Sequence, residues 1–425
     1  MKTEFCEIKS VEAMEILDSR GNPTVAATVT LESGARATAS VPSGASTGVH
    51  EAYELRDKGS TRYLGRGVQS AVGNVNGRIS SALVGVSALD QQRVDSIMIA
   101  LDGTRNKSNL GANAILSVSL AVARAAATEL GIPLYRYLGG IRSNSLPIPM
   151  MNVINGGAHS DNPLDFQEFM IIPHGAEGFG ESVRMGAEVY HALRATLKER
   201  SLSCALGDEG GFAPDLKNER EAIELIIFAI ERAGLAVGKD VSLGLDVAAS
   251  EWYRSGTGSY FLPKSKREMS SADLADLLCS LADDYPIISI EDGAGEDDID
   301  GWRYLSDKLS SLILVGDDLF VTSRERVEMG KRVGIANSVL IKPNQIGTLS
   351  EVAETVIYAT ANGFSTVMSH RSGETCDPFI ADLSVALGCP YIKSGALARG
   401  ERLAKYNRLL EIESEIFSPN FSYFN

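Results

Sequence analysis

The sequence predicts an α/β protein in which an N-terminal α+β domain precedes an eight-stranded α/β barrel of the TIM type. Three observations support this fold class. The chain has 425 residues, which exceeds what one hydrophobic core usually organises. The segment from Gly139 to Pro149 is rich in chain-breaking residues and is the best candidate for a linker. Beyond it, short apolar runs end one after another in an ionisable residue. We therefore expect an N-terminal capping domain over residues 1–140 and a barrel domain over residues 141–425.

The first 140 residues carry signals for both strands and helices. Apolar and polar residues alternate from about Thr24 to Val41, and E-S-G-A interrupts them, which predicts a hairpin that turns at about Ser33-Gly34. An Ala- and Leu-rich segment from Ala112 to Leu130 is followed by Gly131 and Pro133. This order is the one expected where a helix ends, so we predict a helix over 112–130.

The second domain repeats one pattern six times. Apolar runs such as L-G-L-D and S-V-L-I-K end in an ionisable residue, and all but the first interval between these residues is 23 to 28 residues. Such spacing matches one strand and one helix of a (β/α)8 barrel, whose strands are parallel and whose catalytic residues lie at the C-terminal ends of the strands. Six side chains are therefore expected at one mouth of the barrel: Asp246, Glu291, Asp317, Lys342, His370 and Lys393.

The residue types at this mouth favour a hard metal ion. Carboxylates from Asp246, Glu291 and Asp317 occur with no cysteine and little histidine near them, and oxygen ligands of this kind suit Mg²⁺. A lysine beside such an ion can act as a general base, because nearby cations lower its pKa towards neutrality. The alternative is that these residues form salt bridges that close the barrel mouth.

Loops supply further polar groups. S-G-A-S-T-G at 43–48 and S-H-R-S-G-E-T at 369–375 combine glycines and hydroxyls, with Arg371 in the second loop, and this combination suits a phosphate group. G-D-E-G-G-F-A-P at 207–214 can carry an acid between its glycines. Ordinary turns and a satisfied polar network are the alternatives for these segments. Three more polar residues precede an apolar run: His159, Gln167 and Glu168.

Composition excludes several classes of protein. A formal net charge of −15 repels nucleic-acid phosphates, so we expect no nucleic-acid partner. No apolar run reaches about 18 residues, and the N-terminus has no apolar signal-peptide core. We therefore expect a cytoplasmic protein without a membrane span. The five cysteines contain no C-x-x-C motif, which indicates neither a disulfide framework nor a zinc site.

Taken together, the motifs resemble those of the enolase family over nearly the whole chain. They include D-S-R-G-N-P-T-V from Asp18, S-G-A-S-T-G from Ser43, D-G-T-R-N-K-S-N-L-G-A-N-A from Asp102, P-M-M-N-V-I-N-G-G-A-H, G-D-E-G-G-F-A-P, K-P-N-Q-I-G-T and S-H-R-S-G-E-T. The resemblance implies an enolase-type barrel whose opening strands are less regular than the standard unit. It also implies a lyase that interconverts 2-phospho-D-glycerate and phosphoenolpyruvate, with Mg²⁺, in glycolysis and gluconeogenesis.

The resemblance implies a role for each site residue. Lys342 would remove the C2 proton, Glu209 would protonate the departing C3 hydroxyl, and Glu168 would support Glu209. The other residues implied to bind substrate are His159, Gln167, His370, Arg371, Ser372 and Lys393.

Two Mg²⁺ ions per active site follow from the same resemblance. Asp246, Glu291 and Asp317 would hold the first ion against the substrate carboxylate. Ser46 would help to hold the second ion, which also touches the phosphate.

Four positions depart from the family's pattern. In the family they form ion pairs between subunits, but this chain has Met14, Ala26, Glu411 and Ser414 there. We therefore expect a homodimer or higher homo-oligomer that does not use those two ion pairs. Two other functions stay open. One is a paralogue that acts on a phosphonate analogue in secondary metabolism, and the other is a binding role of the plasminogen-capturing type.

Overall fold

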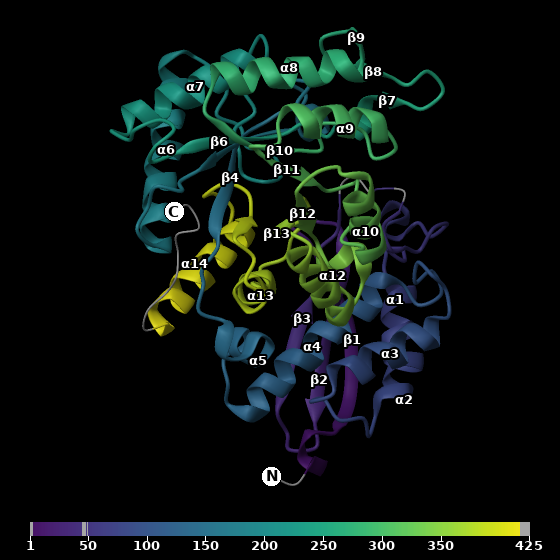
Figure 1. Cartoon of the computed structure of the whole chain (residues 1–425). Coiled ribbons are helices and arrows are strands. Elements are labelled where there is room, and N and C mark those ends of the chain that lie inside the picture. The colour runs from purple at the N-terminus through teal and green to yellow at the C-terminus, as the bar shows by residue number, and fades with distance from the viewer. Residues whose placement is uncertain (1–2, 45–47, 49, 417–425) are drawn as a thin grey trace.

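The N-terminal part of the protein is built on a three-stranded antiparallel sheet. A computed structural model describes residues 3–44, 48 and 50–416 (Figure 1). The strands β1 (Ile8–Leu17), β2 (Pro23–Leu31) and β3 (Arg36–Ser40) lie in that order. The expected hairpin is confirmed, and Gly34 adopts a φ of 94° in its turn. The sequence pattern did not predict β1, because apolar residues of this strand, such as Met14 and Leu17, are exposed and interrupt the alternation of apolar and polar residues.

Helix α4 connects this sheet with the rest of the molecule. The helix expected over Ala112–Leu130 is confirmed as α4, and Gly131 ends it in the left-handed conformation. α4 packs against β2 and β3 and also against α11 (Pro343–Ile346) and α12 (Leu349–Ala361). A helix with neighbours on several sides is apolar nearly all round, as this one is. The other helices of this part are α1 (Gln69–Asn74), α2 (Ser80–Leu83), α3 (Gln91–Asp102) and α5 (Leu134–Gly139).

The remainder of the chain forms a closed barrel of eight strands, as expected. Its order is β10-β11-β12-β13-β14-β4-β5-β6. Six of these strands were expected to end in an ionisable residue, and wherever two of the six pair with each other they run parallel. They are β6 (Ser242–Asp246), β10 (Ile287–Glu291), β11 (Ile313–Gly316), β12 (Ser338–Ile341), β13 (Ser365–Ser369) and β14 (Tyr391–Lys393).

The opening of the barrel departs from a regular strand–helix alternation. β4 (Ile148–Asn155) is parallel to β14, but β5 (Glu168–Ile172) follows β4 without an intervening α-helix and runs antiparallel to both β4 and β6. Because β5 runs the other way, its first residue lies at the end of the barrel where the other strands finish. Glu168 pairs with Asp246 in register.

The outer helices and a small side sheet complete the fold (Figure 1). The side sheet consists of β7 (Tyr253–Arg254), β8 (Ser259–Leu262) and β9 (Arg267–Ser270). The helices are α6 (Phe179–Glu199), α7 (Glu219–Arg232), α8 (Ser271–Asp284), α9 (Ile299–Lys308), α10 (Arg324–Val333), α13 (Phe379–Leu387) and α14 (Gly400–Glu415).

The segment expected to be a linker is only partly one. Gly139 belongs to α5, and Ile148 and Pro149 belong to β4. α5 packs so closely on α13 that a Cβ atom at Gly139 would lie 2.4 Å from the carbonyl oxygen of Ala386. The two parts of the chain are therefore docked directly on each other at this point.

No single helix among the described residues is long and apolar enough to cross a membrane. Two consecutive helical segments, Ala112–Leu130 and Leu134–Arg142, would together be long and apolar enough for a span, but they are bent by 99° relative to each other.

Candidate active site

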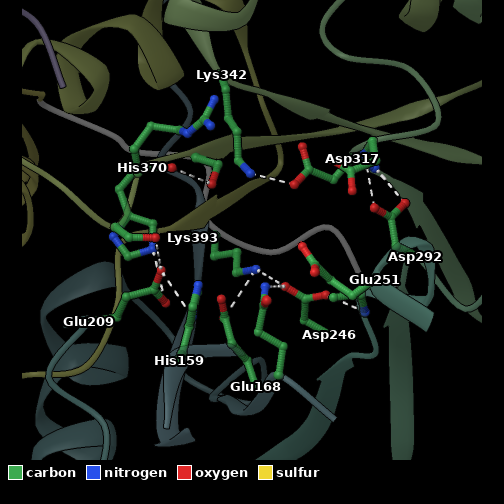
Figure 2. A pocket seen from close by; sticks show the side chains of 16 residues that line it. His159, Glu168, Glu209, Asp246, Glu251, Asp292, Asp317, Lys342, His370 and Lys393 are labelled. Carbon is green, nitrogen blue, oxygen red and sulfur yellow. Dashed lines mark hydrogen bonds and ion pairs between the residues drawn. The ribbon is translucent and has the colours of Figure 1, made fainter. Parts of the chain in front are cut away.

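The predicted site residues meet at one mouth of the barrel because of strand register. Asp246 pairs with Glu291 on the neighbouring strand and with Glu168 on the antiparallel strand β5. Ser369, directly before His370, pairs with Lys393. Figure 2 shows Glu168, Asp246, His370 and Lys393 pointing into a common pocket, and Glu291 is not among the residues that line it. The gathering of functional side chains predicted from the strand ends is thus present.

Lys393 lies at the centre of the carboxylates. Its Nζ atom is 3.0 Å from Asp246 Oδ2, 2.9 Å from Glu291 Oε1 and 3.1 Å from Glu168 Oε2. Gln167 also donates to Asp246 Oδ2, at 3.2 Å. Burial lowers the pKa of the Lys393 ammonium, but the surrounding carboxylates outweigh burial and raise it well above its ordinary value. Lys393 is therefore a fixed positive charge, and it donates to both carboxylate oxygens of Glu291.

Lys342 contacts Asp317 at a second point of the mouth. Its Nζ atom donates to Asp317 Oδ2, and Gln345 donates to Asp317 Oδ1 at 2.9 Å. Burial opposes the charge of Lys342, but Asp317 raises the pKa of this lysine above its ordinary value. This direction is opposite to the lowering expected from the sequence. The expected lowering requires a cation nearby, whereas the nearest charge here is a carboxylate.

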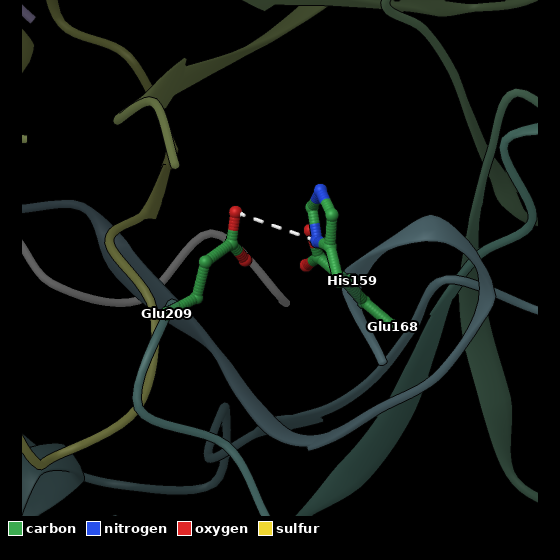
Figure 3. Close-up of side chains that lie close together, drawn as sticks. All are labelled: His159, Glu168 and Glu209. Atoms are coloured by element: carbon green, nitrogen blue, oxygen red, sulfur yellow. Dashed lines mark ion pairs between the residues drawn. The ribbon is translucent and has the colours of Figure 1, made fainter. Parts of the chain in front are cut away.

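A third group of side chains surrounds Glu209, which lies in the loop after α6. His159 Nδ1 is 3.8 Å from Glu209 Oε1, and His370 Nε2 is 3.6 Å from Glu209 Oε2. Asn152 and Ser372 donate to the same carboxylate. Figure 3 shows Glu209 facing His159 and Glu168.

The two glutamates differ in their affinity for a proton. Ligand atoms of His159, Glu168 and Glu209 all lie within 4.8 Å of one another. Burial and the charge of Glu209 raise the pKa of Glu168 well above its ordinary value. Burial works in the same direction on Glu209, but His370 and His159 lie against it and hold its pKa well below the ordinary value. These opposite directions mean that, of the two glutamates, Glu168 has the higher affinity for a proton.

Arg371 and Ser372 lie on the loop after β13, which the N-terminal part of the chain contacts. Arg371 donates to both carboxylate oxygens of Glu51, at 2.9 and 3.2 Å. The backbones of Ser43 and Gly373 form an isolated bridge between the two loops expected to bind phosphate. Ser46, which belongs to the first of these loops, lies outside the described residues.

Two carboxylates that line the pocket, Asp292 and Asp318, were not singled out from the sequence. Carboxylate oxygens of Asp292, Asp317 and Asp318 lie within 4.8 Å of one another. Asp292, at a φ of 42°, accepts the backbone N–H groups of Asp317 and Asp318. Burial and the neighbouring Asp317 raise the pKa of Asp318 to about 8. The adjacent letters D-D at 317–318 were the available signal, but only the structure brings Asp292 to them.

The oxygen-only donor set fits a divalent cation. Carboxylates outnumber cationic side chains at the mouth, and burial together with neighbouring carboxylates raises the pKa of both Glu291 and Asp292 well above their ordinary values. Negative charge is therefore in excess in a buried place, which a hard cation relieves. The predicted ligands Asp246 and Glu291 contact Lys393, and Asp317 contacts Lys342.

Known proteins resemble this chain along nearly its whole length. Residues 8–138 match the family model described as the enolase N-terminal domain, and residues 143–423 match the one described as the enolase C-terminal TIM barrel domain. A curated protein named enolase, from Sulfurimonas denitrificans, is 57% identical over 410 residues, which are 96% of this chain and 97% of that protein.

Proposed function

The chain belongs to the enolase family, and on that premise we propose how its own residues carry out the reversible dehydration of 2-phosphoglycerate to phosphoenolpyruvate. It is a carbon–oxygen lyase of that family. We assign the base and the acid to different residues because Lys342 and Glu209 reach the pocket from different parts of the chain. Lys342 follows β12 and Glu209 lies in the loop after α6, and their side chains enter the pocket from different sides (Figure 2).

Lys342 would take the proton from C2 of the substrate onto Nζ. A base must reach the reacting proton and must be unprotonated, and Lys342 meets the first requirement because its side chain lines the pocket. Its contact with Asp317 opposes the second requirement. A charge that competes for Asp317 would therefore free Lys342 to act as a base.

Glu209 would protonate the hydroxyl that leaves from C3, so that one water molecule departs for each proton taken by Lys342. Of the two glutamates, Glu168 is the one that holds a proton more tightly. Glu168 would therefore supply it to Glu209 when the hydroxyl leaves. His159 and His370 would hold the Glu209 carboxylate in place from the other side.

Asp246, Glu291 and Asp317 would hold a first Mg²⁺ ion, and Ser46 would contribute to a second. When bound, the ions would neutralise the ligating carboxylates and stabilise the second negative charge that develops on the substrate carboxylate. Lys393 would add a fixed positive charge beside that carboxylate, since its ammonium is buried among the same ligands.

Arg371 and Ser372 would bind the substrate phosphate. A guanidinium group presents a planar fork of N–H donors that matches a phosphate, and the Arg371 fork is engaged with Glu51. Phosphate would therefore compete with Glu51 for Arg371. Gln167, which donates to Asp246, would line the same pocket. Residues 1–140 would thus cap the barrel of residues 141–425, and the enzyme would work in the cytoplasm as a homo-oligomer.

The activity is tested by the ultraviolet absorbance of phosphoenolpyruvate formed from 2-phosphoglycerate. We expect turnover with Mg²⁺, loss of turnover in excess chelator, and recovery when Mg²⁺ is restored. Activity that persists in excess chelator would refute the metal assignment. A phosphonate analogue offered at the same concentration should be turned over more slowly, since the 57% identical relative is an enolase. A preference for the phosphonate would favour the paralogue instead.

A further inference from the structure

Arg402 on α14 is completely buried directly behind the site. Its Nη1 atom lies 2.6 Å from His370 Nδ1 and 2.6 Å from the carbonyl oxygen of Arg371. Its Nη2 atom donates to the carbonyl oxygens of Ser372 at 2.6 Å and Asp208 at 3.0 Å. The closest carboxylate paired with it is that of Glu401, at 3.5 Å from Nε. The guanidinium therefore uses its donors on one imidazole and on three backbone carbonyls of two different loops.

The contact with His370 determines the proton position on that imidazole. A guanidinium can only donate hydrogen bonds, so the Nδ1 atom that it faces must be an acceptor and cannot carry hydrogen. In a neutral imidazole the proton then lies on Nε2. Burial keeps His370 neutral, since it lowers the pKa to about 4. The Nε2–H group points to Glu209 Oε2, 3.6 Å away.

The same guanidinium joins the two loops that carry the residues on the leaving-group side. Asp208 directly precedes Glu209, and Ser372 donates to the Glu209 carboxylate. Gly395 closes the arrangement from a further direction. Its φ is 74°, and a Cβ atom there would lie 2.5 Å from the carbonyl oxygen of Glu209 and 3.1 Å from His370 Cε1. The imidazole ring of His370 and the loop that carries Glu209 are therefore both packed closely against Gly395.

We propose that Arg402 is a positioning residue that places the proton of His370 on Nε2 and holds this N–H group against the carboxylate of Glu209. As Glu209 gives its proton to the leaving hydroxyl, a negative charge develops on the carboxylate, and the Nε2–H dipole faces that charge. With the other tautomer a lone pair would face the same charge, and the step would be disfavoured. The role of this dipole rests on the proposed function, but the tautomer itself rests on the contacts of Arg402 alone.

Neutron diffraction from deuterium-exchanged crystals of the full chain tests the tautomer directly. We expect deuterium on His370 Nε2 and none on Nδ1. Deuterium on Nδ1 would overturn the inference, whatever the activity of the enzyme. If instead deuterium lies on Nε2 but 2-phosphoglycerate is not turned over, the proposed function fails and the tautomer stands.

Kinetics of Arg402→Lys and Arg408→Lys test the consequence for catalysis. An ammonium cannot reach all four acceptors of Arg402, so we expect kcat of Arg402→Lys to fall by about 10²-fold with a smaller change in KM. Arg408 is the matched control, because it lies on α14 like Arg402 but pairs with Asp382 of α13. None of its ion pairs among the described residues is with a proposed site residue. We expect Arg408→Lys to keep kcat. Equal kcat values for the two variants at equal thermal stability would show that Arg402 has no positioning role.

Discussion

Two lysines, of which Lys393 is buried and Lys342 is partly buried, supply positive charge at the mouth of the barrel. Lys393 contacts carboxylates from three strands, and Lys342 contacts Asp317. The carboxylates that we propose as metal ligands are among those that these lysines contact. Each lysine is therefore coupled to the ligand set, and its basicity depends on whether a carboxylate or a cation lies beside it.

Replacement of Lys342 by alanine should remove the base while the carboxylates stay in place. Loss of a positioned base costs about 10² to 10⁴ in rate, so kcat should fall at least that far. Exchange of the C2 proton of 2-phosphoglycerate with solvent, followed by NMR, should stop as well. Lys308→Ala, at an exposed position of α9, is the control. C2 exchange at the normal rate in Lys342→Ala would assign the base elsewhere.

His370 should make the free energy of unfolding depend on pH. Burial lowers its pKa from 6.5 to about 4, so between these values the unfolded state binds more protons than the folded state. The contribution of neutral His370 to the free energy of unfolding is therefore complete above about pH 6.5, and it is lost as the pH falls towards 4. At pH 5 the loss is about 2 kcal/mol relative to pH 7.

Urea unfolding of the wild type and of His370→Gln at pH 7 and pH 5 measures this loss. The wild type should lose about 2 kcal/mol more than the variant between the two pH values. An equal loss in both proteins would mean that His370 is not held neutral by the fold.

Among the secondary-structure elements, the antiparallel strand β5 is the one that shapes the site. Parallel strands bring only their last residues to the mouth of a barrel. Because β5 runs in the opposite direction, its first residue, Glu168, lies beside Asp246, and the loop before it carries His159 and Gln167. The residues that we propose for acid–base roles on this side therefore come from a loop and from the start of a strand.

The side sheet anchors this loop. The turn between β8 and β9 donates from the backbone of Lys264 and Ser265 to the two carboxylate oxygens of Asp165, at 2.8 and 3.1 Å. Lys264 Nζ also donates to the carbonyl oxygen of Ser160, at 2.9 Å. Asp165 is buried, so the side sheet fixes the position of the segment between His159 and Gln167.

Asp165→Ala should release this segment. Hydrogen bonds to a charged group contribute about 1.5 to 3 kcal/mol each, and two of them are lost. We expect a raised KM for 2-phosphoglycerate and faster proteolysis between residues 156 and 165. Asp161→Ala, at an exposed position of the same segment, is the control and should behave as the wild type. Unchanged KM and cleavage in Asp165→Ala would show that the side sheet does not position the loop.

In the whole molecule, the N-terminal part completes the site that the barrel begins. Glu51 pairs with Arg371, and Arg124 on α4 pairs with Asp377 at 2.6 Å. Lys107 pairs with Glu351 at 2.9 Å. These ion pairs are largely shielded from solvent, so they hold the two parts in a defined relation more than exposed pairs would. This docking brings together the two loops that we expect to bind phosphate, through the backbone bridge between Ser43 and Gly373.

Assembly of the chain should be nearly indifferent to salt. Met14 and Ser414 are exposed, Ala26 is buried, and Glu411 pairs with Arg408 of its own helix at 3.0 Å. Glu411 thus has a partner within the chain, and the two ion pairs that the family uses between subunits are not available. We expect a homodimer whose sedimentation is the same at low and high salt, since screening weakens exposed charge pairs. Dissociation of the dimer by salt, or a monomer throughout, would contradict this prediction.

The sequence by itself determined which residues end the barrel strands. Short apolar runs that stop at Asp246, Glu291, Lys342 or Lys393 are a local signal, because each run stops where an apolar strand reaches a polar pocket. The helix over Ala112–Leu130 and the hairpin before Arg36 were predicted for the same reason, because their signals lie within a few neighbouring residues.

Only the tertiary structure decided the direction of β5, the approach of Asp292 to Asp317, and the contact of Arg402 with His370. The pairs concerned, Glu168 with Asp246, Asp292 with Asp317, and His370 with Arg402, are 78, 25 and 32 positions apart in the chain. The pKa values of Lys342 and Lys393 were also decided by the tertiary structure, since they depend on which carboxylates lie within about 3 Å of each Nζ atom. A local pattern carries no information on such distances, because they follow from how the whole chain closes into a barrel.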